Sequence, residues 1–242
     1  MQKNNYTYVW VSLVILVFGI IFVPKIVDRV KGGSITQNDR LNLKDANDKL
    51  AYVEMNGERR KVPPFAFIDQ DSLLITNDDY KGKVYLVEFF FTTCPTICPI
   101  MNKNLVQIQN EFKNFENFGV ASFTINPEYD TPSVLKEYAQ DYGITNMDWH
   151  LLTGNMNDIY TLANTGFSIF AAEVPEAEGG FEHSGLFALV DKNGFIRSRV
   201  DKFGNPIVYY RGTITEQDGE NDHGELEQIS ILKEDIKKLL EE

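Results

Sequence analysis

Apolar residues along the chain form one long uncharged stretch near the start and then a series of shorter runs. From Tyr6 to Val23 there are 18 residues without a charge. As a helix this stretch is roughly 27 Å long, close to a bilayer hydrocarbon core of about 30 Å. No small-residue cleavage site follows it, which argues against a signal peptide that is removed. We therefore expect residues 1–24 to form one N-terminal transmembrane helix that serves as an anchor.

The anchor is followed by residues 25–60, in which Asp, Asn, Lys and Gly are mixed as in a stalk and an entry segment to the folded domain. The folded domain is expected over residues 61–242. One lysine precedes the predicted span and three basic residues follow it closely, which is the reverse of the usual charge bias for an exported C-terminal domain. Long domains are translocated despite such a count, so export of the domain is a hypothesis.

The shorter apolar runs alternate between the periods of strands and helices. Val84 to Phe91 is apolar except for Glu88, which is typical of a central strand covered on both faces. Other expected strands are 65–69, 119–126, 149–154, 185–190 and 195–200. Helices are expected after Cys98, from Thr131, over 156–167, and near the C-terminus with Leu226, Ile229, Leu232, Ile236 and Leu239 as its buried stripe. This order predicts an α/β thioredoxin-like sandwich, a central mixed sheet flanked by helices.

The composition of the chain indicates a folded domain and excludes one class of binding partner. The chain is 43% hydrophobic over 242 residues, enough to bury a full core. Its formal net charge of -12 argues against nucleic acid as a partner, because nucleic-acid binders present a basic face.

The only two cysteines, Cys94 and Cys98, directly follow the apolar strand, and each precedes a proline. Pro99 favours a helix that begins at Pro99 with Cys98 at its cap. The positive end of that helix favours thiolates, which both nucleophilic attack and metal binding require. One regular helical turn places β-carbons about 5–6 Å apart, whereas a disulfide needs about 3.5–4.5 Å. A metal tolerates the wider spacing, while a redox pair and a structural disulfide stay open.

A metal site needs a third ligand, and the chain has three histidines. His150 lies within an apolar strand and is expected in the core, and His223 lies in a polar loop. His183 ends a glycine-rich loop just before a core strand, from which it can reach the cysteines. Two thiolates and one imidazole suit a three-coordinate cuprous ion, whereas structural zinc usually takes four protein ligands.

Four motifs together resemble the Sco/SenC family of membrane-anchored copper-handling proteins: "TTCPTICP", "INPEYDTP", "WHLLTG" and "FEHSGLFALVDKNG". The resemblance covers roughly residues 60–240. It implies a thioredoxin fold in which Cys94, Cys98 and His183 bind copper, as Cu(I) and also as Cu(II).

The resemblance also implies a function, that of a metallochaperone for the binuclear copper centre of cytochrome c oxidase subunit II. It implies an upstream copper donor or thiol reductant as a further partner. The expected location is the bacterial inner (cytoplasmic) membrane, with a single span and the soluble domain on the exported, periplasmic side. A tether to the acceptor's membrane raises the effective concentration of the two proteins.

The chain departs from the family pattern at two positions. Thr96 and Asn126 stand where the family often has Asp. The loss of two carboxylates near the cysteines is expected to change the affinity for Cu(II), which prefers harder ligands than Cu(I) does. Asp130 is still present, and we interpret it as part of the turn before its helix.

The alternative function is that of a thiol–disulfide reductase that acts on cysteines of the oxidase subunit or of other exported proteins. Cys94 would attack a substrate disulfide and Cys98 would resolve the mixed intermediate. Glu182, His183 and Ser184 stand where a redox thioredoxin places a cis-proline, which counts against this hypothesis. A peroxidase fits the cysteine motif poorly. A metallochaperone is not an enzyme in the strict sense, so whether the protein is an enzyme depends on this choice.

Overall fold

The computed structural model describes residues 7–31, 50–200, 206 and 208–242. The chain forms two compact units, residues 1–38 and residues 39–242.

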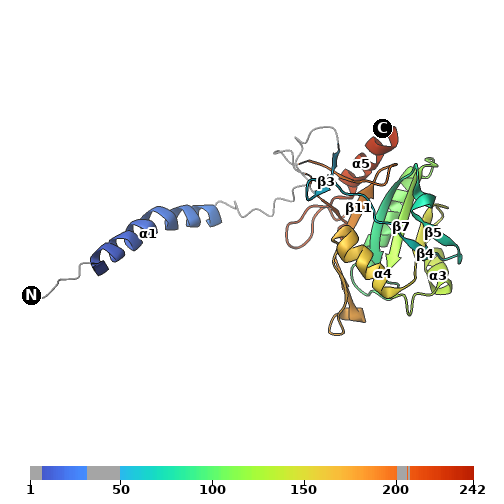
Figure 1. The fold of residues 1–242 in the computed structure, drawn as a ribbon, viewed down its shortest axis with the longest axis horizontal. Helices are drawn as coiled ribbons and strands as arrows, with labels where there is room; N and C mark the ends of the chain where they lie inside the picture. Colours follow the sequence, from blue (N-terminus) through green and yellow to red (C-terminus); the bar gives the residue numbers. More distant parts are fainter. Residues whose placement is uncertain (1–6, 32–49, 201–205, 207) are drawn as a thin grey trace, which may run out of the picture. The chain divides into compact units, whose positions relative to one another are not determined.

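The first unit contains the helix α1 (Thr7–Lys31), drawn in blue in Figure 1. Pro24 lies within this helix, and charged residues follow from Lys25 onward. The sequence predicted a transmembrane anchor over residues 1–24, of which residues 1–6 lie outside the described residues. That prediction is not confirmed: across the described ranges, no helix combines the length and the apolar character needed to cross a membrane.

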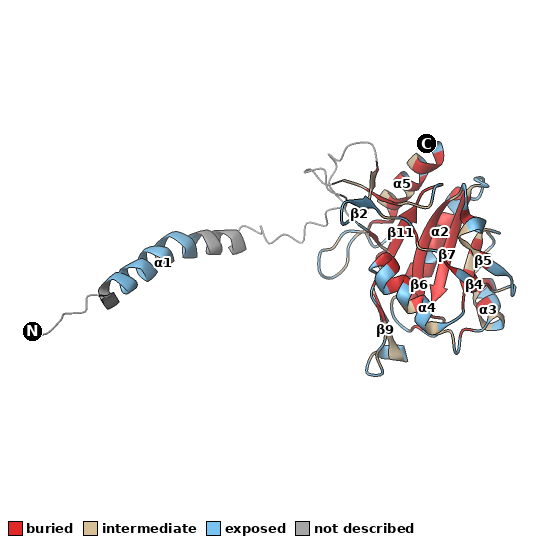
Figure 2. Cartoon of the chain, viewed as in Figure 1, coloured by how far each residue is buried: buried red, intermediate tan, exposed pale blue. Residues whose placement is uncertain are grey.

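The second unit is built on a mixed sheet in the order β1-β12-β11-β6-β7-β8, with β13 paired to β11. Its parallel half contains β6 (Val84–Phe90), β7 (Phe118–Thr124) and β8 (Trp149–Leu152). The antiparallel half contains β11 (Leu186–Val190), β12 (Ile196–Ser198), β1 (Ala51–Tyr52) and β13 (Tyr210–Arg211). The central strands β6 and β7 are buried along their whole length, as Figure 2 shows in red. Burial on both faces explains why their sequences are nearly continuous apolar runs.

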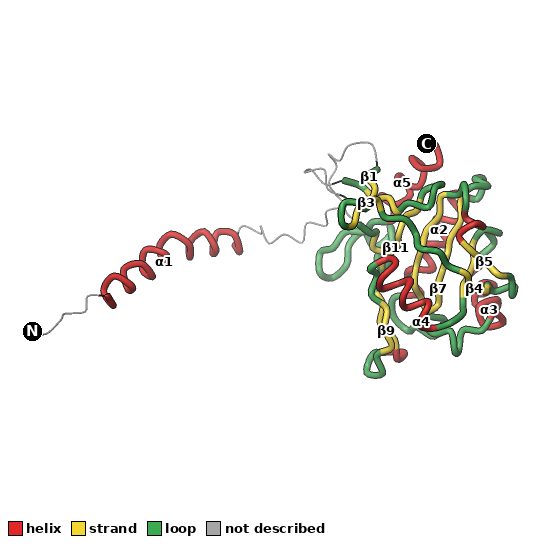
Figure 3. The backbone as a smooth tube through the Cα atoms, in the orientation of Figure 1, coloured by secondary structure: helices red, strands yellow, loops and turns green. Residues whose placement is uncertain are grey.

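Helices cover the sheet on both sides, with α4 in front of the strands and α2 behind them in Figure 3. The long helices are α2 (Cys98–Phe112), α3 (Pro132–Tyr142) and α5 (Ile229–Glu241), and α4 (Met156–Thr161) continues into the π-helix η3 (Leu162–Phe167). Two short 3₁₀ helices are η2 (Asn77–Tyr80) and η4 (Glu178–Gly180). The mixed sheet flanked by helices confirms the predicted thioredoxin-like α/β fold.

Among the described residues, three small hairpins form separate two-stranded sheets beside the main sheet. They are β2 (Glu54–Met55) with β3 (Glu58–Arg59), β4 (Ala66–Ile68) with β5 (Leu74–Thr76), and β9 (Ala171–Glu173) with β10 (Phe181–His183). The sequence placed His183 at the end of a glycine-rich loop, but the loop ends at Gly180 and the first residues of strand β10 separate it from His183. Backbone pairing with β9 makes His183 the last residue of a strand.

Two further predictions need correction. Residues 50–60 were assigned to the stalk and entry segment, outside the folded domain, but Leu50 and Val53 are buried in the core and β1 pairs with β12. Leu226 was placed on the buried stripe of the last helix, but it precedes α5 and is exposed. The other four residues of the predicted stripe, Ile229, Leu232, Ile236 and Leu239, are buried on α5. The helix begins only after Gln228, so Leu226 cannot follow its period.

Candidate metal centre

The two cysteines lie where a buried strand gives way to a helix. Cys94 is in the turn after β6, and Cys98 is the first residue of α2. The helix thus begins one residue earlier than predicted, with Ile97 at the cap and Pro99 in the first turn. No side chain caps this end. The Cys94 sulfur instead accepts hydrogen bonds from the backbone N–H groups of Thr96 and Cys98 at this end of the helix, which stabilise negative charge.

The fold brings His183 to these sulfurs. Its Nε2 atom lies 3.2 Å from the Sγ of Cys98. One donor atom from each of Cys94, Cys98 and His183 lies within 4.8 Å of the other two. In the part of the chain that the structure describes, no other such cluster of His, Cys, Asp or Glu occurs. The spacing fits a single metal ion shared by three ligands.

The three residues are mostly buried, and the two cysteines are free thiols. The exposed fractions are 8% for Cys94, 1% for Cys98 and 7% for His183. Cys94, Thr96 and His183 line a shallow cavity of about 300 Å³, to which Glu178 and Glu182 also contribute. Cys94 is thus the sulfur that an incoming group meets first.

The cysteines differ strongly in acidity. A hydrogen bond from Cys98 lowers the pKa of Cys94 to about 3. The same hydrogen bond, together with burial, raises the pKa of Cys98 far above its usual range. In the metal-free protein the pair therefore shares one proton, held by Cys98, and Cys94 is a thiolate at neutral pH.

Aromatic packing and a close backbone approach hold His183 in position. The ring of His183 meets Phe91 edge to face with centroids 6.0 Å apart. In the turn of the β9–β10 hairpin, a Cβ on Gly179 would lie only 2.9 Å from Phe91 and 3.3 Å from Pro95. The second ring nitrogen of His183, Nδ1, is buried and has no hydrogen-bond partner among the described residues.

Sequence reasoning missed the role of Asp130. The carboxylate of this buried residue accepts hydrogen bonds from the Thr92 N–H at 3.1 Å and from the hydroxyls of Thr92 and Thr124. It thereby fixes the chain just before Cys94. Of the two positions that depart from the family pattern, Thr96 places its hydroxyl 3.7 Å from the Cys94 sulfur. Asn126 bonds through its backbone to Thr124 and Tyr129.

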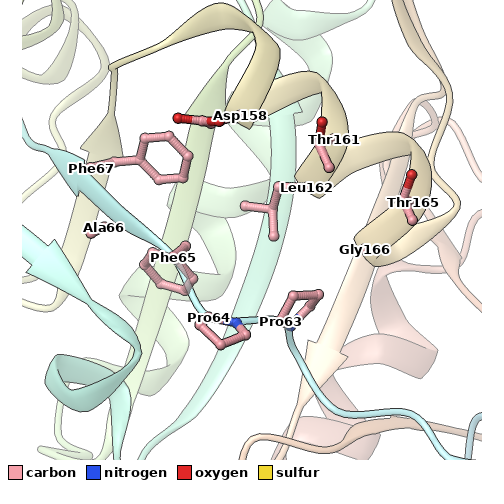
Figure 4. Close-up of a pocket in the computed structure, with 10 residues that line it drawn as sticks. All are labelled: Pro63, Pro64, Phe65, Ala66, Phe67, Asp158, Thr161, Leu162, Thr165 and Gly166. Carbon is pink, nitrogen blue, oxygen red and sulfur yellow. The ribbon is translucent and has the colours of Figure 1, made fainter.

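The structure separates the other candidate residues from this centre. His150 forms a hydrogen bond of 2.9 Å with the buried Asp69, in agreement with the expected core role. His223 is exposed in a loop. Figure 4 shows a second cavity, of about 430 Å³, between residues 63–67 and the helices α4 and η3. Its 10 lining residues include no cysteine or histidine, so it is not part of the metal centre.

Comparison with known proteins relates the chain to a protein family. A model of the SCO1/SenC family matches residues 53–215, which include all three residues of the centre. The chain belongs to the SCO1/SenC family. The resemblance stated from the sequence motifs is thereby confirmed.

Individual members of the family show how far the likeness extends. The SCO1 protein homolog of Bacillus subtilis is 36% identical over 137 residues, which span 55% of this chain and 70% of that protein. The crystal structure of a SCO1/SenC family lipoprotein from Bacillus anthracis matches with a TM-score of 0.60 and 27% identity, over 74% of this chain and 95% of that one. BsSco, described as a member of the Sco family of cytochrome c oxidase assembly proteins with a disulfide switch, matches with a TM-score of 0.59 and 27% identity. It covers 75% of this chain and 94% of its own.

Proposed function

We propose that this protein is a copper metallochaperone that binds Cu(I) through Cys94, Cys98 and His183. We propose that it delivers the ion to the cysteines of the binuclear copper centre in cytochrome c oxidase subunit II. The observation that carries the proposal is the convergence of two sulfurs and one imidazole nitrogen within 4.8 Å. The assembly role in cytochrome c oxidase given for the related BsSco supports the choice of acceptor.

The donor set favours copper over other metals. Two thiolates and an imidazole are soft and borderline ligands, which suit Cu(I) in a three-coordinate site. A structural zinc site usually takes four protein ligands, and among the described residues no fourth His, Cys, Asp or Glu joins the cluster. We propose that the same site also binds Cu(II). Thr96 lies beside Cys94 at the position where the family often has an Asp, whose carboxylate would be a harder ligand.

The geometry also supports transfer by ligand exchange. Cys94 is already a thiolate, and Cys98 gives up the shared proton when the ion binds. An acceptor thiolate enters through the cavity on the Cys94 side and bonds to the ion while the donor sulfurs leave. Because the site is low-coordinate and open on that side, no ligand has to dissociate before the acceptor attacks.

A thiol–disulfide reductase is the second candidate, and the depressed pKa of Cys94 favours it. The Cys94 thiolate would attack a substrate disulfide, releasing one substrate thiolate and forming a mixed disulfide. Cys98, after losing its proton, would attack the Cys94 sulfur and release the second substrate thiolate. The substrate is then reduced and the Cys94–Cys98 pair oxidised, so a further thiol reductant has to regenerate the protein.

We propose that the N-terminal segment attaches the domain to the exported face of a bacterial cytoplasmic membrane. The uncharged stretch from Tyr6 to Val23 supports attachment. The Bacillus anthracis relative, which is a lipoprotein, supports a membrane location for the family. Partners on that face are the oxidase subunit and an upstream copper donor or thiol reductant.

Titration of the reduced, purified full-length protein with Cu(I) tests the proposal. We expect one equivalent to bind tightly, and Cys94→Ala, Cys98→Ala and His183→Ala each to weaken binding by about 100-fold or more. His223→Ala is the matched control, because this exposed histidine lies outside the cluster. If His183→Ala binds copper as well as the control does and disulfide reduction persists, the reductase replaces the chaperone.

A further inference from the structure

The two walls of the metal centre differ in charge. One wall is the β9–β10 hairpin, whose residues 171–183 carry four glutamates and no lysine or arginine. The glutamates are Glu173, Glu176, Glu178 and Glu182, and all four are exposed. The other wall, residues 91–100, has no charged residue and exposes Pro95, Pro99 and Ile100.

The acidic wall directly borders the cysteines. Glu178 and Glu182 line the same cavity as Cys94 and His183, and Gly179 packs its backbone against Phe91 and Pro95. None of the four carboxylates forms an ion pair with any residue that the structure describes. The polar Nδ1 atom of the buried His183 also lacks a partner there. The described residues therefore leave the four carboxylates without a positively charged partner, and these charges suit an external basic partner.

We infer that this face docks a protein that presents lysine or arginine side chains beside the thiols that take up the copper. The inference rests on the proposed function, because the docked thiols have to reach the ion through the cavity. The basic groups would face the glutamates of the β9–β10 hairpin, and an apolar surface would cover Pro95, Pro99 and Ile100. The net charge of -12 adds a long-range attraction for such a basic surface.

The expected consequence is kinetic. Complementary charge around a site accelerates encounter by about 10-fold or more at low ionic strength, and salt removes the effect because the Debye length falls to about 3 Å at 1 M. The rate of copper transfer should therefore depend on the charge of the acceptor, in addition to its thiols.

The test uses two synthetic acceptor peptides, each with the same pair of cysteines, flanked by lysines in one and by glutamates in the other. Full-length protein loaded with Cu(I) is mixed with each peptide, and the second-order rate of transfer is measured. We expect the lysine peptide to react about 10-fold faster at low salt, with the ratio falling toward one in about 0.5 M salt.

Two charge-matched variants locate the effect. Glu176→Gln with Glu178→Gln should reduce the ratio of the two rates severalfold. Glu54→Gln with Glu58→Gln removes the same charge from the exposed β2–β3 hairpin, which Figure 2 shows apart from β9, and should leave the ratio unchanged. A neutralised hairpin that slows both peptides equally would mean that the glutamates act on the ion, and this would overturn the inference.

Equal rates for the two peptides with the wild-type protein, or equal losses in the two variants, would also overturn it. These results leave the proposed function intact, because copper still moves to thiols. Failure to bind Cu(I), or to pass it to either peptide, would instead contradict the proposed function and the docking inference with it.

Discussion

At the scale of single residues, Glu88 stands out because it places a carboxyl group in the middle of the buried strand β6. It is fully buried, and one oxygen accepts a hydrogen bond of 2.6 Å from Ser122 while the other has no partner among the described residues. Burial raises its pKa from 4.5 to about 7. The folded state therefore favours the protonated acid.

This shift predicts how stability depends on pH. Because the pKa of Glu88 is higher in the folded state than in the unfolded state, its contribution to the free energy of unfolding is largest below about pH 4.5. This contribution falls by about 3 kcal/mol as the pH rises to about 7, and it is nearly constant at higher pH. Urea unfolding of the reduced, metal-free protein at pH 5 and pH 8 measures the effect. Glu88→Gln should gain stability relative to wild type at pH 8 by about 2.5 kcal/mol more than at pH 5. A difference that does not change with pH would contradict this assignment.

The hydrogen bond between the cysteines predicts the reactivity of Cys94. With a pKa of about 3, its alkylation by iodoacetamide should proceed at a constant rate from pH 5 to pH 8, whereas an ordinary thiol accelerates about tenfold per pH unit. Cys98→Ala removes the largest cause of the shift, so the pKa of Cys94 should rise and a steep pH dependence should return. Mass spectrometry of the alkylated protein gives both rates. A steep profile in the wild type, or a flat one in the variant, would contradict the shared proton.

At the scale of elements, the β9–β10 hairpin carries His183 to the cysteines, and its turn contains a natural pair of test positions. Gly179 and Gly180 have nearly the same left-handed backbone, with φ of +82° and +80°. A Cβ on Gly179 would meet the Phe91 ring at 2.9 Å, whereas a Cβ on Gly180 would meet nothing within 4 Å. The two positions thus separate backbone strain from the close approach.

Gly179→Ala and Gly180→Ala should both lose about 1 kcal/mol of stability, because alanine is strained at positive φ. Only Gly179→Ala should also push the hairpin away from Phe91 and weaken Cu(I) binding, by about 10-fold, as His183 moves. Thermal unfolding and Cu(I) competition titrations measure the two effects. Equal loss of copper affinity in both variants would show that the contact with Phe91 does not position His183.

At the scale of the whole molecule, residues 39–242 form a compact unit with its own sheet and core. Removal of residues 1–38 should therefore leave the unfolding temperature and the Cu(I) affinity unchanged. If the N-terminal segment is the membrane attachment, the same truncation should move the protein from the membrane fraction to the supernatant. The full chain, fractionated in parallel, is the control. A truncated protein that still pellets with membranes would place the attachment elsewhere.

Much of the fold was predictable from local patterns. The run from Val84 to Phe91 could be interpreted as a strand because burial on both faces demands apolar side chains throughout. The predicted hairpin between residues 185–190 and 195–200 is present, with Leu189 opposite Arg197 and Gly194 at positive φ in the turn. The β9–β10 hairpin was missed because its strands have only three residues each, and the segment between them contains a proline and two glycines. Asp235 was missed as a core residue because only the fold shows that Arg199 and Tyr210 bind its carboxylate.

The sequence alone determined the strand, the turn and the helix that present Cys94 and Cys98, since neighbours within about ten residues dictate these elements. It also named His183 as the third member of the site. Only the tertiary structure decided that the imidazole lies 3.2 Å from a sulfur 85 positions away, because that distance depends on sheet order and on packing between Gly179 and Phe91. The link from Asp130 to Thr92 and the acidic wall beside Cys94 were likewise visible only in the fold, because the contacts and surfaces that define them join segments far apart in the chain.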